Sequence, residues 1–376
     1  MYIYKSIVYV TCHEKRIQSM LNDANQNNRT ILIAPLNWGL GHATRCIPII
    51  KALQDNNYIP IIASDGIALA LLRKEFPCLK FLELPSYEIE YAKNGKNFKW
   101  KLLKNSPKMI EAILTEKKLV KTWIIEHGID GIISDNRLGV YNKSIPSVFI
   151  THQLNVMTGN TTWLTSRLHQ NIIKKYSECW VPDIETSPNL AGELSHIKNN
   201  SFKLNYLGPL SRMHKKDVPK KYDLMVILSG PEPQRGILEE KLKIELQRYE
   251  GNVIFIKGIV EKNQTKEQIG NIFYYNFMNS RQLEQTFNES EIVLCRSGYT
   301  TIMDLAKLGK KAFFIPTPGQ YEQMYLARKL KEEGLVPYAD QDSFIIENLS
   351  ELKLYDGLHS SDHTVNWERL FSVFQP

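Results

Sequence analysis

The stretch Arg296-Ser-Gly-Tyr-Thr-Thr-Ile-Met-Asp304 decides how the second half of this chain folds. It follows Glu291–Cys295, an apolar run that predicts a short buried strand, and the spacing from Tyr299 to Leu308 predicts a helix. The Arg-Ser-Gly turn then leads into a helix N-terminus, where free N–H groups and the positive end of the helix dipole favour phosphate. Asp304 lies one helical turn after Thr300, so its carboxylate can accept hydrogen bonds from ribose hydroxyls.

The residues after this helix add a sugar-binding loop. Gly309 ends the helix, and Lys311–Ile315 predicts the next buried strand, followed by a polar loop whose amide and carboxylate side chains can bind sugar hydroxyls. Phosphate, ribose and hexose can therefore all be bound within one segment. The alternatives are helix capping by the threonines and a structural bridge made by Arg296. The candidate donor-binding residues here are Arg296, Ser297, Gly298, Thr300, Asp304, Gln320, Glu322 and Gln323.

Two further glycine-containing turns follow predicted strands. Asn37-Trp-Gly-Leu-Gly-His-Ala-Thr-Arg45 follows Thr30–Ala34, and Ser229-Gly230-Pro-Glu232 follows Asp223–Leu228. Open parallel α/β sheets bind ligands at the carboxyl ends of their strands, so these turns are expected to line a cleft between two domains. His42 would face that cleft from the start of a helix and act as a base near neutral pH. Its alternative role is a hydrogen bond at the helix start.

These three segments, in this order, resemble the MurG-like glycosyltransferases, family 28 of the GT-B superfamily. In that family an Arg-x-Gly…Thr…Glu helix and a Pro…Gln-Gln loop hold a UDP-sugar. A Gly-rich loop ending in Gly-His lies at the mouth of the interdomain cleft, and a Gly-Gly-Ser turn lies near the diphosphate. Asp304 stands where the family usually has Glu, and Pro231 and Glu232 replace flexible positions of the Gly-Gly-Ser turn.

The resemblance implies a hexosyltransferase that moves a sugar from a UDP-linked donor to an unidentified hydroxyl acceptor: a glycan, a lipid-linked molecule or a small molecule. It implies inversion at the anomeric carbon, His42 as the base, and neither a metal nor another cofactor. It also implies that Phe277-Met278, after the strand Ile272–Tyr275, contacts the uracil base, with core packing as the alternative. The predicted acceptor side or loop consists of Gly39, Gly41, Asp135 and His152, for which turn formation is the alternative role.

Three other functions fit parts of the pattern. Gly39–Cys46 also resembles the opening loop of the MurG-related UDP-sugar hydrolases of nonulosonate synthesis, in which water replaces the acceptor. A Rossmann oxidoreductase is suggested by Asp65, which ends the second strand where a ribose-binding acid would lie, although the third glycine of that motif is missing. A catalytically inactive nucleotide-sugar sensor fits the altered turn at Ser229.

The chain has 376 residues, more than one hydrophobic core usually organises, and this length predicts two domains. Apolar strands alternate with helices such as Cys46–Gln54 in both halves, so we expect an α/β fold of the GT-B type, with two Rossmann-like parallel sheets facing a cleft. The expected division is an extension of unknown role at 1–30, an acceptor domain at 31–208, a linker at 209–221, a donor domain at 222–360, and a C-terminal helix at 361–376 that crosses back to the first domain.

The composition is that of a soluble globular protein, with 43% hydrophobic and 23% charged residues and no apolar run long enough to cross a bilayer. Five scattered cysteines without a CxxC pair predict neither a zinc site nor a disulfide framework, and hence a cytoplasmic location. The net charge is +7. Basic and aromatic residues from Lys93 to Lys101, with Lys104 and Lys108, predict either a solvated helix face or peripheral contact with an anionic inner membrane face. No nucleic-acid-binding motif accompanies this charge.

Overall fold

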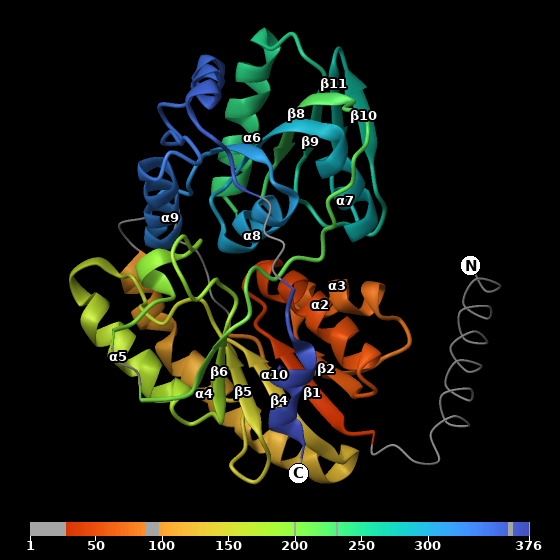
Figure 1. The fold of residues 1–376 in the computed structure, drawn as a ribbon, viewed down its shortest axis with the longest axis vertical. Coiled ribbons are helices and arrows are strands. Elements are labelled where there is room, and N and C mark those ends of the chain that lie inside the picture. The colour runs from red at the N-terminus through yellow and green to blue at the C-terminus, as the bar shows by residue number, and fades with distance from the viewer. Residues whose placement is uncertain (1–27, 88–97, 199–200, 231, 360–363, 376) are drawn as a thin grey trace, which may run out of the picture.

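A computed structural model describes residues 28–87, 98–198, 201–230, 232–359 and 364–375, with the backbone alone at 98–106 and at residue 160. These residues form two lobes, each built around one sheet (Figure 1). Most of the expected extension at 1–30 and most of the basic cluster that begins at Lys93 lie outside the residues whose side chains are described. The predicted architecture of two α/β domains with parallel sheets is confirmed.

The first lobe contains a seven-stranded parallel sheet in the order β3-β2-β1-β4-β5-β6-β7. Its central strands are apolar runs buried on both faces, the expected pattern for a parallel sheet covered by helices on both sides. The strands are β1 (Thr30–Pro35), β2 (Ile59–Ser64), β3 (Lys80–Glu83), β4 (Ile129–Asp135), β5 (Ser147–Ile150), β6 (Glu178–Val181) and β7 (Leu204–Tyr206). The helices are α2 (Gly41–Asp55), α3 (Gly66–Glu75), α4 (Phe98–His127) and α5 (Thr162–Ile173), with short 3-10 turns at Gly159–Thr161 and Gly192–Leu194.

The second lobe contains a six-stranded sheet in the order β10-β11-β9-β8-β12-β13, parallel except for the antiparallel edge strand β10. The strands are β8 (Tyr222–Ile227), β9 (Val253–Ile256), β10 (Lys266–Ile269), β11 (Ile272–Tyr275), β12 (Ser290–Cys295) and β13 (Lys311–Phe314). The helices are α6 (Gln234–Glu245), α7 (Ser280–Glu289), α8 (Tyr299–Leu308) and α9 (Tyr321–Glu332), with 3-10 segments at Leu246–Arg248 and Ile346–Leu354.

Each sheet has one place where the strand order reverses, and the predicted site segments lie there. In the first sheet β1 lies between β2 and β4, so the turn after β1 and the end of β4 flank the switch point. In the second sheet β8 lies between β9 and β12, so the turns after β8 and β12 flank the corresponding point. Ligands of open α/β sheets bind at such switch points.

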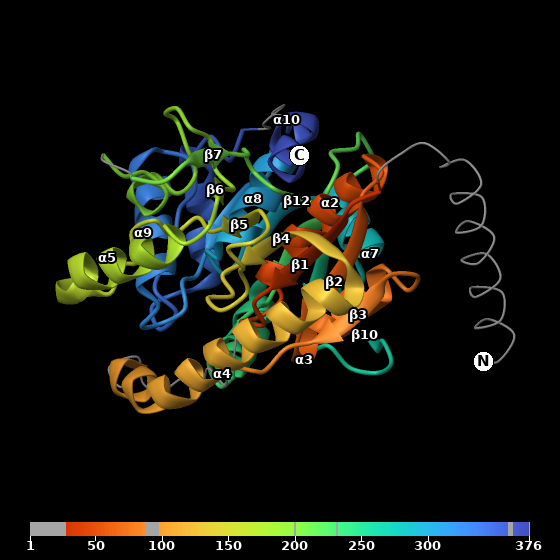
Figure 2. The ribbon, with the colours of Figure 1, turned by 90° about the horizontal axis from the view of Figure 1, so that it is seen from below.

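The chain crosses back from the second lobe to the first. Helix α10 (Trp367–Phe371) and the 3-10 turn η6 (Ser372–Phe374) lie against the first sheet (Figures 1 and 2). Phe371 and Phe374 pack on Tyr58 and Trp180, and the main-chain oxygen of Phe374 accepts a 2.6 Å hydrogen bond from Nη1 of Arg29. The described residues of the first domain therefore include segments from both ends of the chain.

Some local expectations differ from the structure. Helix α2 begins at Gly41 instead of Cys46, because the glycine turn leads directly into it. The short strands β6, β7 and β10 were not predicted, because each contains a polar residue that shortens its continuous apolar run. Cys78 is disulfide-bonded, against the expectation from the cysteine spacing, whereas Cys46, Cys179 and Cys295 are free and buried.

Candidate active site

The turns at the two switch points lie against each other where the domains meet. Helices α2 and α8 are in contact, and a Cβ added at Gly41 would lie 2.8 Å from Oγ1 of Thr300. Any side chain at position 41 therefore forces a movement at this interface. Gly39 has a φ of +73°, a conformation that glycine adopts without strain. Both glycines of the predicted acceptor loop thus have backbone roles at the domain junction.

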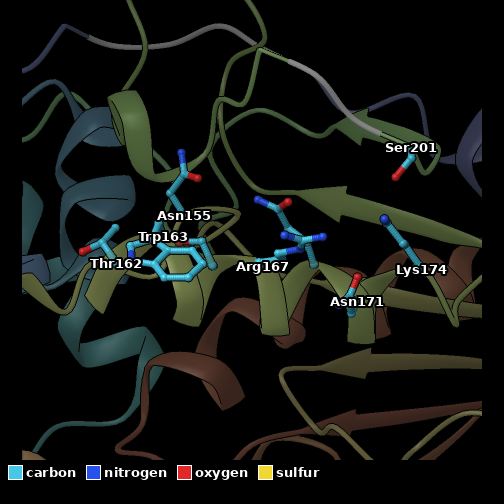
Figure 3. Close-up of a pocket in the computed structure, with 9 residues that line it drawn as sticks. Asn155, Thr162, Trp163, Arg167, Asn171, Lys174 and Ser201 are labelled. Atoms are coloured by element: carbon cyan, nitrogen blue, oxygen red, sulfur yellow. The ribbon is translucent and has the colours of Figure 1, made fainter. Parts of the chain in front are cut away.

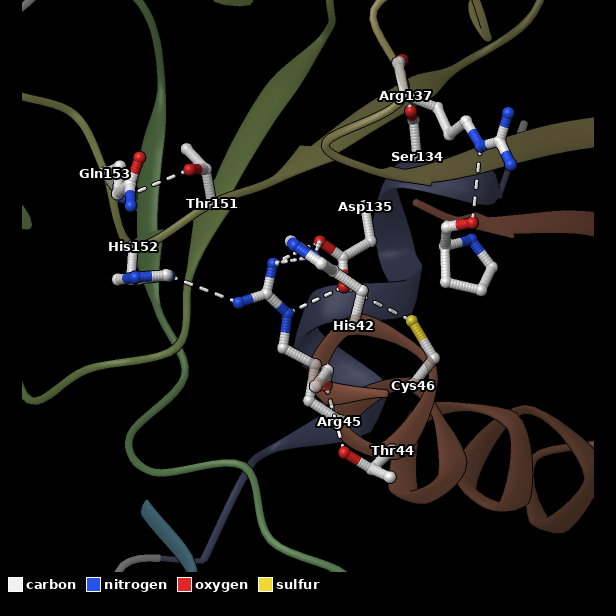
Figure 4. A network of polar contacts seen from close by, with 12 residues as sticks. His42, Thr44, Arg45, Cys46, Ser134, Asp135, Arg137, Thr151, His152 and Gln153 are labelled. Atoms are coloured by element: carbon white, nitrogen blue, oxygen red, sulfur yellow. Dashed lines mark hydrogen bonds and ion pairs between the residues drawn. The ribbon is translucent and has the colours of Figure 1, made fainter. Parts of the chain in front are cut away.

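His42 lies in the first turn of α2, with its side chain 13% exposed. Its Nδ1 is 2.9 Å from Oδ1 of Asp135, the last residue of β4 (Figure 4). Burial lowers the pKa of His42, and Arg45 lowers it further, whereas Asp135 acts in the opposite direction. Burial opposes ionisation of Asp135, but Arg45 and His42 hold the pKa of that carboxyl well below its usual range. A neutral histidine with an anionic partner at Nδ1 is suited to accept a proton at Nε2.

His152 connects this pair to the second domain. It follows β5, and its Nε2 lies 2.7 Å from Oε1 of Glu322, in the first turn of α9. Its ring stacks on Tyr299 of α8, with a centroid distance of 4.2 Å and an angle of 13° between the planes. Gln153 also donates a hydrogen bond to Glu322. Burial raises the pKa of Glu322, but His152, His42 and Arg45 together lower it below its ordinary value.

Asp304 is buried on α8, facing the segment that joins the domains. Its Oδ1 accepts a 2.6 Å hydrogen bond from Oγ of Ser211, and the next residue, Arg212, donates to Oγ of Ser280 at 2.9 Å. Burial raises the pKa of Asp304 to about 6, although the charge of Arg212 and the bond from Ser211 both favour the ionised form. Ionisation of Asp304, the carboxyl predicted to bind ribose, therefore costs free energy in the folded protein.

The two terminal nitrogens of Arg296 are occupied by protein acceptors, whereas its buried Nε has no hydrogen-bond partner among the described residues. Its guanidinium is buried and donates 3.0 Å hydrogen bonds to the main-chain oxygens of residues 234, 315 and 316, and a 2.6 Å bond to Oε1 of Gln341. Ser297 is also fully buried and donates to the main-chain oxygen of residue 323. These two side chains hold the loop after β13 against the turn after β12, so their contribution is to shape the predicted donor site.

The loop after β13 is folded by its own glutamines. Oε1 of Gln323 accepts from the main-chain N–H of Thr317 at 2.8 Å, and its Nε2 donates to Oε1 of Gln320 at 2.7 Å. Oγ1 of Thr317 is buried and has no hydrogen-bond partner among the described residues. It would lie 3.9 Å from a Cβ added at Gly230, in the turn after β8. An unpartnered hydroxyl beside an exposed turn is suited to meet an oxygen of a ligand.

Of the remaining predicted donor residues, Ser229 follows β8, and Phe277 and Met278 follow β11, on the side of β8 away from β12. Ser229 is exposed, and the main-chain oxygen of Phe277 accepts a 2.6 Å hydrogen bond from Nε2 of Gln264. Nζ of Lys74, on α3 of the first domain, lies 5.4 Å from the centroid of the Phe277 ring. Met278 is partly buried and packs against the core.

Two residues at the centre of the site were not predicted. Arg45 was read only as part of the turn motif, yet it is 2% exposed and bonds both oxygens of Asp135 (Figure 4). Ser211 lies in the predicted linker but binds Asp304. A signal for Arg45 existed, because it lies three residues after His42 and hence on the same face of the helix.

Both carboxylate oxygens of Asp65 are bonded to other side chains of the first domain. Asp65 pairs with Arg137 and accepts a 3.0 Å hydrogen bond from Nδ2 of Asn37, which belongs to the turn after β1. Arg137 also donates to Glu116 at 3.0 Å, and Glu116 accepts from the hydroxyl of Tyr87 at 2.7 Å. The ribose role suggested for Asp65 under an oxidoreductase therefore has no free carboxylate to perform it.

A cavity of about 720 Å³ lies along α5, apart from the residues described above (Figure 3). Its lining includes Trp163, Arg167, Gln170 and Lys174 from successive turns of the helix, and Asn155, which lies three residues after His152. The cavity extends over the first domain away from the His42–Asp135 pair.

Within the described residues, no cluster of three histidine, cysteine or acidic side chains is arranged to hold a metal ion. The chain does contain one Asp-x-Asp sequence, Asp340-Gln-Asp342, which the expectation of metal independence overlooked; both carboxylates are exposed. No helix among the described residues is long and apolar enough to span a bilayer.

Comparison with known proteins relates the chain to glycosyltransferases. Residues 234–364 match the glycosyltransferase family 28 C-terminal domain. The UDP-N-acetylglucosamine--N-acetylmuramyl-(pentapeptide) pyrophosphoryl-undecaprenol N-acetylglucosamine transferase of Haemophilus ducreyi is 21% identical over 66% of this chain and 69% of its own length. The enzyme of the same name from Glaesserella parasuis is 22% identical over 82% of this chain and 84% of its own length.

Solved structures share the fold. Acinetobacter baumannii MurG superposes with a TM-score of 0.54 and 16% identity, over 93% of this chain and 99% of its own. The glycosyltransferase SnogD from Streptomyces nogalater superposes with a TM-score of 0.61 and 12% identity, over 93% of this chain and 100% of its own. The family match, the relatives and the shared fold together indicate a glycosyltransferase with a GT-B fold. The chain is similar to MurG, and residues 234–364 carry its match to family 28.

Proposed function

We propose that this protein transfers a sugar from a UDP-linked donor, bound by the second domain, to a hydroxyl of an acceptor bound by the first, with inversion and without a metal or other cofactor. The observation that carries the proposal is the His42–Asp135 pair, 2.9 Å apart at the switch point of the first sheet and next to the N-terminus of α8. The named relatives use UDP-N-acetylglucosamine and a pyrophosphoryl-undecaprenol acceptor, so a lipid-linked acceptor is our first choice.

In the proposed reaction, Nε2 of His42 takes the proton of the acceptor hydroxyl while its oxygen bonds to the anomeric carbon. The bond between that carbon and the diphosphate oxygen breaks, and UDP leaves with the electron pair. Asp135 stabilises the imidazolium that forms, through the Nδ1–H. Main-chain N–H groups at the start of α8, together with its dipole, offset the charge of the departing diphosphate.

The test is proton NMR of the purified protein with UDP-N-acetylglucosamine, first alone and then with the lipid-linked acceptor named for the relatives. We expect the sugar to stay intact alone and to be consumed when the acceptor is added. His42→Ala should slow consumption by about 10²–10⁴-fold, the usual contribution of a general base. His127→Ala is the matched control, because His127 precedes β4 and lies at the opposite edge of the sheet.

Release of free sugar without an acceptor would overturn the transferase assignment in favour of the hydrolase alternative. Binding of donor without turnover under either condition, in wild type and variant alike, would favour the inactive sensor. Equal rates in His42→Ala and wild type would remove His42 as the base while leaving the transferase assignment in place.

We further propose that α5 brings the protein, in the cytoplasm, to the anionic inner face of a membrane, where a lipid-linked acceptor resides. Trp163, Leu164 and Leu168 of this helix are 68%, 43% and 58% exposed. Arg167 lies on the same helix, and Lys174 directly follows its last residue. Exposed apolar residues flanked by cations are typical of helices that lie in a membrane interface.

Vesicle sedimentation tests this contact. Binding to vesicles that contain an anionic lipid should fall sharply in Leu168→Glu and be unaffected in Ile244→Glu, which changes a similarly exposed residue on α6 of the second domain. Equal binding by the two variants would refute the role of α5.

A further inference from the structure

Arg45 is placed to contact four atoms in three groups of the site at once. Its Nε donates to Oδ2 of Asp135 at 2.6 Å, and its Nη2 donates to Oδ1 of the same carboxylate. Nη2 also lies 2.8 Å from Nδ1 of His42, and Nη1 lies 3.2 Å from Nδ1 of His152. The side chain is buried, and Figure 4 shows the guanidinium between the two imidazoles. Its planar fork therefore spans the whole polar part of the first domain's site.

The chemistry of arginine decides where the proton of His152 lies. A guanidinium only donates hydrogen bonds and stays charged in proteins, so a nitrogen bonded to it must present a lone pair. Nδ1 of His152 is then the acceptor, and the ring proton is on Nε2. That nitrogen is 2.7 Å from Oε1 of Glu322, which can only accept while ionised. The bonds therefore run outward from Arg45, to Asp135 on one side and through His152 to Glu322 on the other.

At His42 the same guanidinium competes with a carboxylate. Nδ1 of His42 faces both Oδ1 of Asp135 and Nη2 of Arg45. If Nδ1 carries the proton, it donates to Asp135 and leaves Nε2 free; if it does not, it accepts from Arg45. His152 has no such competitor at Nδ1 among the hydrogen bonds of the described residues, so Arg45 is the group that keeps its Nδ1 unprotonated, while Glu322 favours a proton on Nε2.

We propose that Arg45 is a positioning residue of this site: it fixes the ring proton of His152 on Nε2 and, through His152, holds the Glu322 carboxylate of the second domain against the first. The proposal rests on the proposed function in one respect, the sugar-binding role of Glu322. The stacking of His152 on Tyr299 keeps the ring in the plane that both bonds require. Arg45 thereby links the proposed base with the proposed sugar-binding loop.

The experiment is a long-range ¹H–¹⁵N correlation spectrum of the imidazole groups in the uniformly labelled full chain, recorded without donor or acceptor. The signals of the two rings are assigned with His152→Gln and His42→Gln. We expect His152 in wild type to show a protonated Nε2 and an unprotonated Nδ1. In Arg45→Met, Nδ1 loses the donor that keeps it unprotonated, so we expect it to gain a proton while Nε2 stays bonded to Glu322. Arg73→Met, a change on the neighbouring helix α3, should leave the wild-type pattern intact.

Arg45→Lys keeps the positive charge but removes the planar guanidinium group. A single ammonium cannot bond Asp135 and His152 in the manner of the planar group, so we expect the lysine variant to lose the wild-type pattern as well. Retention of that pattern in Arg45→Lys would show that charge alone suffices and would overturn the positioning role. So would a wild-type His152 with its proton on Nδ1, or an unchanged His152 in Arg45→Met.

Glu322→Gln decides the matter even if Arg45→Met does not fold. An amide can either accept from Nε2–H or donate to an unprotonated Nε2, so it does not select a tautomer. If Arg45 fixes the proton, His152 keeps it on Nε2 in this variant; if Glu322 does, the pattern changes and the proposal fails. Because no substrate is present, failure of the proposed transfer reaction would not alter any of these results.

Discussion

Replacing Asp304 with asparagine should make the unfolding of this protein less dependent on pH. The carboxyl has a pKa of about 6 in the folded protein against an ordinary value of 3.8, because burial disfavours its charge. Each pKa unit corresponds to about 1.4 kcal/mol, so the shift is equivalent to about 3 kcal/mol. Between these two pKa values the folded state binds more protons than the unfolded state, and stability falls as the pH rises. Above about pH 6 the full cost is present.

The assay is urea unfolding of wild type and Asp304→Asn at about pH 4.5 and about pH 7.5, followed by circular dichroism. Wild type should lose about 2 kcal/mol more than the variant over this interval, because about 1 kcal/mol of the cost is already present at about pH 4.5 and groups common to both proteins cancel in the difference. Ser211→Ala, which removes a hydrogen bond to the ionised carboxyl, should widen the loss. If the free energies of unfolding of wild type and Asp304→Asn changed with pH in parallel, the raised pKa of the buried Asp304 carboxyl would be refuted. In a separate titration, UDP should bind Asp304→Asn about 1–3 kcal/mol more weakly than wild type at neutral pH.

Three further variants test other contacts. Gly41→Ala should lower stability by about 1–3 kcal/mol, since its Cβ would lie 2.8 Å from Oγ1 of Thr300; thermal unfolding checks this, and Thr300→Ala in the same chain should restore most of the loss. Asp135→Asn should cost about 3–5 kcal/mol in urea unfolding, because it leaves the buried charge of Arg45 uncompensated, and an unchanged midpoint would contradict the pairing. Phe374→Ala should cost about 3–5 kcal/mol, since this fully buried ring joins the C-terminal segment to the first domain; a change below 1 kcal/mol would show that the segment contributes little.

The sequence predicted the architecture well because parallel strands are apolar runs that a local window can detect. The turns after β1, β8 and β12 could be placed at the carboxyl ends of strands for the same reason: each follows such a run directly. The position of His42 was predicted from the turn after β1 and that of Glu322 from the loop after β13, and their roles stay predictions. What local patterns do not contain is the pairing between distant residues. Arg45 and Asp135 are separated by ninety positions, and their ion pair depends on the order of the strands.

The predicted role of Arg296 was also limited by partners that are distant in the sequence. An arginine in a turn before a helix is typical of phosphate binding, and nothing nearby in the sequence indicated another partner. Its acceptors come from residues 234, 315, 316 and 341, which approach only after the second sheet has formed. Ser211 was hidden for a similar reason, because the expected linker had no periodicity from which a partner on α8 could be inferred.

The return of residues 367–374 to the first domain affects how the protein is made. A ribosome that has synthesised all seven strands of the first sheet, through Tyr206, has not yet made Phe371 and Phe374, which cover Trp180 and Tyr58. Those residues emerge about 170 residues later, a delay of roughly ten to thirty seconds at ordinary translation rates of ~5–20 residues per second. During that interval an apolar face of the nascent first domain stays open. The domain is therefore expected to need chaperone protection until the second domain has been translated.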